Sequence, residues 1–312
     1  MTTTTGVHDR MRAAADDYLA MRRALGFKLV GTDRLLVQFI DHLQQAGVAT
    51  ITTEAAVAWA TQPVGVQPAW WRTRLQTVRQ FAIYLQTLDP TVEIPPVKLL
   101  PHATARAVPF IYTHQQILAL LEAAGRLRPM TAATYTTLIG LLSVTGMRVG
   151  EVIGLDLDDL DRDRELLTVR RSKFGKSRQL PLHPTTTAQL TSYLRTVDRR
   201  VPDRRTPALL VSTAGTRLFY SNVHLRFQQL TRTAGIHPVT SGCRPRLHDL
   251  RHTFAVDTLV GWQRDGDDVQ ARLPWLSTYL GHTDPGSTYW YLSATPELLG
   301  AAAERLDGQD RP

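Results

Sequence analysis

Two arginines in this sequence each have a possible partner three residues away. Arg148 is followed by Glu151, and Arg251 is preceded by His248. Side chains three positions apart share one face of a helix, so each pair could address a single chemical group. Planar guanidinium groups suit the nonbridging oxygens of a phosphate, where charge builds when an oxygen nucleophile attacks. The two pairs therefore indicate phosphoryl transfer, although either pair alone is more often a solvated surface pair.

A basic turn lies between the two pairs. Residues that favour strands occur at 166–171 and again at 178–182, on either side of Phe174-Gly175-Lys176. This pattern predicts a β-hairpin with Lys173 near its tip. An ammonium group on a flexible turn could deliver a proton to a leaving oxygen.

Together these segments resemble the active-site motifs of tyrosine recombinases of the phage integrase family. The likeness covers residues 110–295, and a weaker likeness to the family's helical core-binding domain precedes it. Each motif is weak by itself, whereas the whole set in this order is specific. The matching segments are Thr145–Glu151, Lys173–Leu182, Arg246–Ala255 and Leu280–His282, followed by Tyr291.

The resemblance implies which residues contact the scissile phosphate. Arg148 and Arg251 would neutralise its charge, and His282 would donate to it, at a position where the family has histidine or tryptophan. Tyr291 would be the nucleophile, because the family's nucleophilic tyrosine falls nine positions after this histidine, and Tyr291 lies nine positions after His282. Tyr289 is close enough to be confused with it but is expected to pack, as aromatic side chains mostly do.

The remaining expected roles concern protons and support. A tyrosine hydroxyl has a pKa of about 10 and attacks poorly unless its proton is removed. The resemblance makes His248 the candidate general base and Lys173, in preference to Lys176, the acid that protonates the leaving 5′-oxygen. Glu151 and Asp249 are expected to support the catalytic residues.

The charge of the chain favours a polyanionic partner. Lys plus Arg number 36 and Asp plus Glu 28, a net charge of +8, which suits phosphate neutralisation with counterion release, although solubility alone could explain it. Arginine supplies most of this charge and can contact phosphates through two hydrogen bonds at once. The expected DNA contacts are Arg72, Arg74, Arg79, Lys176, Arg178 and Arg246. A solvated helix surface would look the same for the first three.

Two domains are expected from the periodicity. Residues 1–100 form amphipathic helices, for example 32–45; a proline-rich stretch leads into a linker at 101–108; and 109–312 form the catalytic domain. Thr113 and Gln116 form a capping-box pattern where its first helix should begin. Further helices are expected at 130–144, 147–155, 185–196, 222–234, 248–260 and 273–280. These elements predict a fold that is mainly α with a small antiparallel β-sheet. The resemblance implies that the helical core-binding domain precedes a mixed α/β catalytic domain.

No metal or other cofactor is expected. Cys243 is the one cysteine, which excludes thiolate clusters and an internal disulfide. Asp156, Asp158, Asp159 and Asp161 indicate a solvated turn rather than a magnesium site. A phosphate-binding GxxxxGK[ST] loop for ATP is also missing. The lack of a signal pattern and of an apolar run of about 18 residues predicts a cytoplasmic protein without membrane contact, bound to the nucleoid through DNA.

The C-terminal region raises two further questions. Residues 296–306 place Leu298, Leu299, Ala302 and Leu306 at helical spacing, a narrow apolar stripe that must be buried. It could dock on its own domain, but the resemblance favours a neighbouring protomer in a DNA-bound tetramer, through a cyclic head-to-tail contact. The stretch from Gly261 to Arg272 is longer and more charged than in compact relatives, and its role is open.

The resemblance implies site-specific recombination of double-stranded DNA, by strand cleavage through a 3′-phosphotyrosyl intermediate and a Holliday junction. One alternative is DNA relaxation of the type IB topoisomerase kind, which uses similar chemistry without pairing two sites. A second alternative is a catalytically silent DNA-binding regulator, because a fold does not guarantee an activity. The complete set of six catalytic positions argues against the second.

Overall fold

The computed structural model describes residues 4–100, 108–170, 177–240, 242–282, 286, 288 and 289. The chain divides into two compact units, residues 1–106 and 107–312. Apart from Val108, the expected linker at 101–108 lies outside the described residues. No helix among the described residues is both long enough and apolar enough to cross a membrane.

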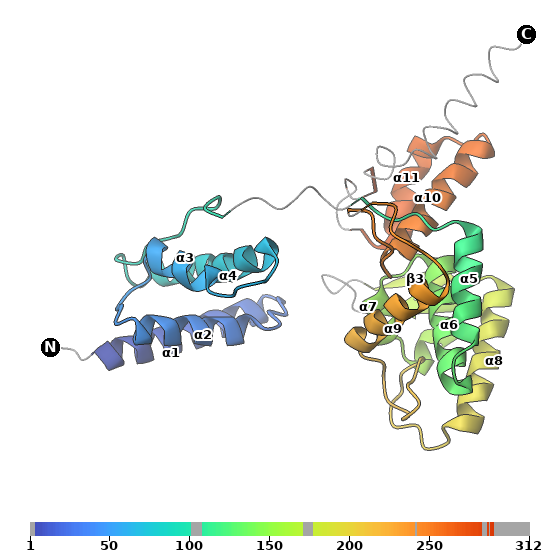
Figure 1. Cartoon of the computed structure of the whole chain (residues 1–312), viewed down its shortest axis with the longest axis horizontal. Coiled ribbons are helices and arrows are strands. Elements are labelled where there is room, and N and C mark those ends of the chain that lie inside the picture. Colours follow the sequence, from blue (N-terminus) through green and yellow to red (C-terminus); the bar gives the residue numbers. More distant parts are fainter. Residues whose placement is uncertain are drawn as a thin grey trace, which may run out of the picture. The chain divides into compact units, whose positions relative to one another are not determined.

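The first unit is built from helices around one apolar core (blue to teal in Figure 1). The helix expected at 32–45 is present with those bounds, because its apolar side chains recur on one face and are buried. Phe39 on this helix packs edge to face against Trp59, with ring centroids 5.2 Å apart. The helices are α1 (Thr4–Ala24), α2 (Thr32–Gln45), α3 (Thr53–Thr61) and α4 (Pro68–Gln86).

The second unit is mostly helical and carries one small sheet, which confirms the expected fold class. Helix α6 packs against α5, α8 and α10 (Figure 1). The first helix of the second unit, α5, begins after Thr113, where both hydrogen bonds of the capping box are present. The helices are α5 (His114–Gly125), α6 (Pro129–Thr145), α7 (Val149–Gly154), η1 (Leu157–Asp159), α8 (Pro184–Arg200), α9 (Tyr220–Thr233), α10 (Asp249–Arg264) and α11 (Val269–Leu280).

The sheet has the antiparallel order β1-β2-β3, with strands β1 (Leu160–Asp161), β2 (Leu166–Val169) and β3 (Arg178–Pro181). Strands β2 and β3 are the two arms of the expected hairpin, and Val169 pairs with Arg178 at the end nearest its tip. Alternate side chains such as Leu167 and Leu180 are buried in the core of the unit. The tip itself, residues 171–176, lies outside the described residues.

A glycine turn brings the end of α6 against α10 and α11. Gly146 has φ 59°, the left-handed region, and ends α6. A Cβ atom at this position would lie 2.4 Å from a ring carbon of Phe254 and 3.1 Å from Leu280. Only glycine therefore fits here, and the close contact sets the position of Arg148 two residues later.

Two local expectations need correction, and the structure also defines one stretch whose role was left open. Helix α7 begins at Val149 rather than 147, because the backbone of Arg148 is extended and forms the N-cap. The acidic turn is only partly solvated, because Asp159 is buried and forms an ion pair with Arg170. The charged stretch from Gly261 to Arg272 comprises the end of α10, a turn and the start of α11.

Candidate active site

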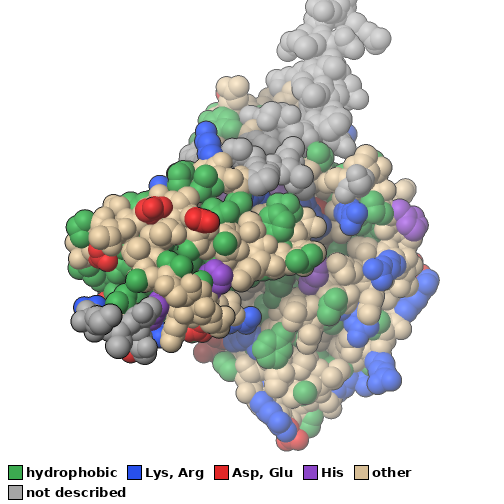
Figure 2. Space-filling view, turned by 60° about the vertical axis from the view of Figure 1, so that its left-hand side comes forward, with side chains coloured by type: hydrophobic (Ala, Val, Ile, Leu, Met, Phe, Trp, Pro, Cys, Tyr) green, Lys and Arg blue, Asp and Glu red, His purple; other side chains and the backbone are tan. Residues whose placement is uncertain are grey.

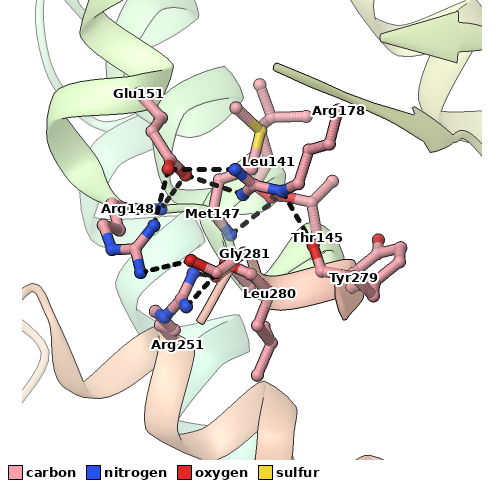
Figure 3. Close-up of polar contacts among 11 residues, drawn as sticks. Leu141, Thr145, Met147, Arg148, Glu151, Arg178, Arg251, Tyr279, Leu280 and Gly281 are labelled. Carbon is pink, nitrogen blue, oxygen red and sulfur yellow. Dashed lines mark hydrogen bonds and ion pairs between the residues drawn. The ribbon is translucent and has the colours of Figure 1, made fainter. Parts of the chain in front are cut away.

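Three arginines from three different elements bind the C-terminal end of α11 (Figure 3). Arg178, Arg251 and Arg148 donate to the consecutive carbonyl oxygens of residues 279, 280 and 281, at 2.8, 2.8 and 3.0 Å. The last carbonyls of a helix have no partner within the helix and lie at the negative end of its dipole. They can therefore hold three guanidinium groups close together despite the repulsion among them.

Gly281 makes this arrangement possible. It ends α11 in the left-handed region with φ 68°, which turns the chain away from the helix axis. A Cβ atom at Gly281 would lie 2.9 Å from a terminal nitrogen of Arg178. A larger residue would strain the backbone and displace that guanidinium group.

Glu151 joins two of the three arginines. Its Oε1 accepts from the Nη1 atoms of Arg148 and Arg178 at 2.8 and 3.0 Å. Its Oε2 accepts from the backbone N–H of Arg148 at 2.9 Å and from Nη2 of Arg178 at 2.8 Å. The carboxylate is the N3 member of the α7 capping box and only 7% of its side chain is exposed. It therefore both starts α7 and orients the two guanidinium groups.

The carboxyl group of Glu151 stays ionised across the physiological range of pH. Burial alone would raise the pKa of this carboxyl, but the hydrogen bonds from Arg178 and Arg148 outweigh it and lower the pKa to about 2. A carboxyl with a depressed folded-state pKa stabilises the fold at any pH above its unfolded value. This stabilisation is lost only as the pH falls through the ordinary carboxyl range towards 2.

Arg251 is the most deeply buried of the three arginines, with 2% of the residue exposed. Besides the end of α11, it donates to the carbonyl oxygen of Gly146 at 2.8 Å. Its guanidinium group thus links α10 to the end of α6 and the end of α11. These contacts fix its direction before any substrate binds.

The start of α10 carries the other expected residues of this motif. His248 is the N-cap, is exposed, and packs edge to face against His252 with ring centroids 4.9 Å apart. Asp249 is fully buried and accepts from Nε and Nη2 of Arg246 at 3.0 and 2.8 Å. Burial raises the pKa of the Asp249 carboxyl, and Arg246 opposes that rise. Asp249 thus holds Arg246 and the start of α10 in place.

His282 follows the helix end directly and lies within the arginine cluster. Its backbone N–H donates to Ser277 at 2.9 Å, and its Nδ1 lies 2.7 Å from the hydroxyl oxygen of Thr288. Burial lowers the pKa of the ring, and the positive charges of Arg251 and Arg148 lower it further, to about 4. The ring is therefore neutral at physiological pH.

The expected DNA contacts of the first unit differ from one another. Arg74 is buried, lies over the ring of Trp59 at 3.7 Å and donates to its carbonyl at 2.8 Å, which does not agree with a phosphate contact. Arg72 and Arg79, together with Arg22, line a cavity of about 590 Å³ that has no acidic residue in its wall. The Nε atoms of Arg22 and Arg79 do not face the cavity, because they are buried, and they have no hydrogen-bond partner among the described residues.

The structure therefore brings together Arg148, Glu151, Arg251 and His282, with His248 at the start of the same helix as Arg251. Lys173, Lys176 and Tyr291 lie outside the described residues. No cluster of three or more His, Cys, Asp or Glu side chains suited to a metal ion occurs among the residues that the structure describes.

Two parts of the site were missed in the sequence. Arg178 was expected to contact DNA, but its Nε, Nη1 and Nη2 atoms all donate within the protein, so its place is that of a positioning residue. The backbone carbonyl groups of residues 279–281 were also missed, because every residue has a carbonyl group and the side-chain types do not show which of them bind arginine. Only Gly281, a typical helix C-cap, marked the end of the helix that presents them.

We expect Arg178→Met to destabilise the second unit by about 3 kcal/mol, because it leaves the buried Glu151 with one arginine instead of two. Urea unfolding of the full-length chain measures the change. The matched control is Arg126→Met, which removes an exposed helix ion pair with Glu122 and should change the unfolding midpoint little. Equal effects of the two substitutions would contradict the positioning role.

The chain is similar to known proteins in sequence and in fold. Residues 111–297 match the model of the phage integrase family. The putative integrase/recombinase y4rB of Sinorhizobium fredii is 44% identical over 95% of this chain and 96% of its own. Tyrosine recombinase XerD of Mycobacterium tuberculosis is 32% identical over 64% of this chain and 61% of its own. The crystal structure of the XerH site-specific recombinase, in a post-cleavage complex with palindromic difH substrate, shares the fold with a TM-score of 0.64, at 18% identity over 89% of this chain and 80% of that one.

Proposed function

The chain belongs to the phage integrase family, and from this premise we propose that it exchanges DNA strands through a temporary bond between Tyr291 and a DNA phosphate. It is a tyrosine recombinase, an enzyme that cleaves and rejoins DNA strands at specific sites.

The convergence of three guanidinium groups at one helix end carries this proposal. Glu151 balances one of the three positive charges, and the neutral His282 adds none. The cluster therefore keeps an excess of positive charge that an anionic phosphate would neutralise. Donors that are already held in place stabilise the charge of a phosphoryl transition state without reorganising. Arg148 and Arg251 are the two that we assign to the nonbridging oxygens.

In the proposed reaction the Tyr291 oxygen attacks the scissile phosphorus while the bond from phosphorus to the 5′-oxygen breaks. The phenol proton passes to His248, and Lys173 gives a proton to the departing 5′-oxygen. The products are a 3′-phosphotyrosyl bond and a free 5′-hydroxyl. A 5′-hydroxyl from the partner site then attacks this bond and releases Tyr291. One phosphoester replaces another at each step, so the exchange needs no nucleotide cofactor.

We propose that the first unit grips the DNA backbone through the arginine-lined cavity. Arg22, Arg72 and Arg79 line the cavity, and no acidic residue is among the residues that form its wall. Guanidinium groups in such a wall can donate to the phosphates of a DNA backbone. Figure 2 shows Lys and Arg side chains in several places on this face of the molecule. Arg246, partly exposed, is a further candidate contact.

Recombination requires two DNA sites, each cut on both strands, which calls for four active sites. We propose a tetramer on DNA, held by the apolar stripe of residues 296–306 packing on a neighbouring protomer, with a Holliday junction between the two rounds of exchange. That segment lies outside the described residues. The DNA substrate would place the working enzyme in the cytoplasm.

The test is recombination between two plasmid copies of a site selected from random duplexes by binding. We expect exchanged products in EDTA, because arginines and not a metal ion stabilise the transition state, and binding that weakens steeply with salt. Relaxed circles without exchange would instead indicate topoisomerase-like activity. Loss of products in EDTA and their return with magnesium would contradict the proposed chemistry.

A further inference from the structure

The ring of His282 is held by a buried hydroxyl group. Thr288 is 1% exposed, and its oxygen lies 2.7 Å from Nδ1 of His282. The backbone N–H of His282 is fixed at the same time by its bond to Ser277. The main chain and one ring nitrogen are thus both anchored, which leaves the ring little freedom to turn.

The charges around His282 decide how many hydrogens the ring carries. Arg251 and Arg148 bind the two carbonyls that immediately precede it, and Arg178 binds the third. Together with burial, these cations keep the pKa of the ring at about 4. A neutral imidazole has a hydrogen on one nitrogen and a lone pair on the other. Its chemical use therefore depends on which nitrogen has the hydrogen.

We infer that Thr288 is a positioning residue whose hydroxyl donates to Nδ1 of His282 and so keeps the ring hydrogen on Nε2, ready to be donated to a nonbridging oxygen of the scissile phosphate. This inference rests on the proposed function, because it needs the phosphate to bind beside the arginine cluster. The opposite arrangement, with Nδ1–H donating to Thr288, would turn a bare lone pair of Nε2 towards an anionic oxygen. That would oppose the attraction of the arginines.

Thr288→Val keeps the size of the side chain and removes only its hydroxyl group. We expect it to slow single-turnover cleavage of a nicked suicide substrate about tenfold, a typical loss when the partner that orients an active-site histidine is removed. Equilibrium binding of the same DNA should not change, since the buried Thr288 side chain presents almost no surface to a ligand. Thr288→Ser keeps the hydroxyl and should cleave at close to the original rate.

The same substitution made in a His282→Trp variant distinguishes a role of Thr288 in orienting the ring hydrogen from a role in packing. An indole has one N–H donor and no second tautomer, so in His282→Trp the direction of the hydrogen no longer depends on residue 288. Adding Thr288→Val to His282→Trp should therefore cause no further loss of cleavage. If Thr288→Val costs the same factor in both backgrounds, its effect is structural and the inference is wrong.

A measurement on the DNA-free protein does not depend on activity. In the full-length chain labelled with ¹⁵N-histidine, the ring signals of His282, identified by their loss in His282→Gln, should show a hydrogen on Nε2 and none on Nδ1. In Thr288→Val this preference should weaken. A hydrogen on Nδ1 in the unmodified protein would overturn the inference. If instead the tautomer is as expected but His282→Gln cleaves at the original rate, the assignment of His282 to the phosphate fails, and with it that part of the proposed function.

Discussion

Tyr291→Phe should bind the recombination site normally and form no covalent complex with DNA. The substitution removes one oxygen atom, and without that atom nothing at this position can attack the phosphorus. Incubation with a nicked suicide substrate, followed by denaturing electrophoresis, measures the adduct directly. The expected result is loss of the adduct to the detection limit, with unchanged affinity for the DNA.

The matched control for this result is Tyr289→Phe. Tyr289 is two residues away and half exposed, and it loses the same oxygen atom. We expect its covalent complex to form at nearly the original level, because only a phenol placed in line with the leaving oxygen can react. An adduct that survives in Tyr291→Phe and disappears in Tyr289→Phe would move the nucleophile to residue 289.

The second large effect is expected for Lys173→Ala. If Lys173 protonates the departing 5′-oxygen, its loss should slow cleavage by about 10² to 10⁴-fold, the usual range for general acid catalysis. A substrate with sulfur in place of that oxygen should restore the rate, because thiols ionise with a pKa of about 8.5 and leave without a proton. Single-turnover rates on the two substrates give the comparison.

Two further variants make the sulfur experiment specific. Arg148→Ala should recover little on the sulfur substrate, because the charge on the nonbridging oxygens still needs neutralising. Lys176→Ala should lose little on the ordinary substrate. If the sulfur substrate restores the cleavage rate of Lys176→Ala but not that of Lys173→Ala, Lys176 is the residue that protonates the leaving oxygen.

The sequence predicted well those parts of the fold whose signals are local. The helix at 32–45 follows from apolar residues at helical spacing, and the start of α5 follows from Thr113 with Gln116 three residues later. The two arms of the hairpin follow from strand-favouring residues on either side of a glycine turn. In each case the residues that decide the structure are neighbours in the chain.

The predictions that were wrong concern side chains whose contacts are made with residues far away in the chain. Arg74 was expected on the surface because arginine usually is, but it stacks on Trp59, which lies 15 residues away and supplies both a ring and a carbonyl group. Arg178 was expected to contact DNA because no sequence pattern shows that Glu151 and the end of α11 receive its hydrogen bonds.

The helix end that gathers the arginines also affects how this enzyme can diverge in sequence. Every amino acid supplies a carbonyl group, so replacing the residue at 279 or 280 leaves the acceptors for Arg178 and Arg251 in place, provided that the new side chain packs. Inserting or deleting one residue in α11 would instead rotate those carbonyls by about 100° around the helix axis. Substitutions in the last turn of α11 should therefore be tolerated far better than changes in its length.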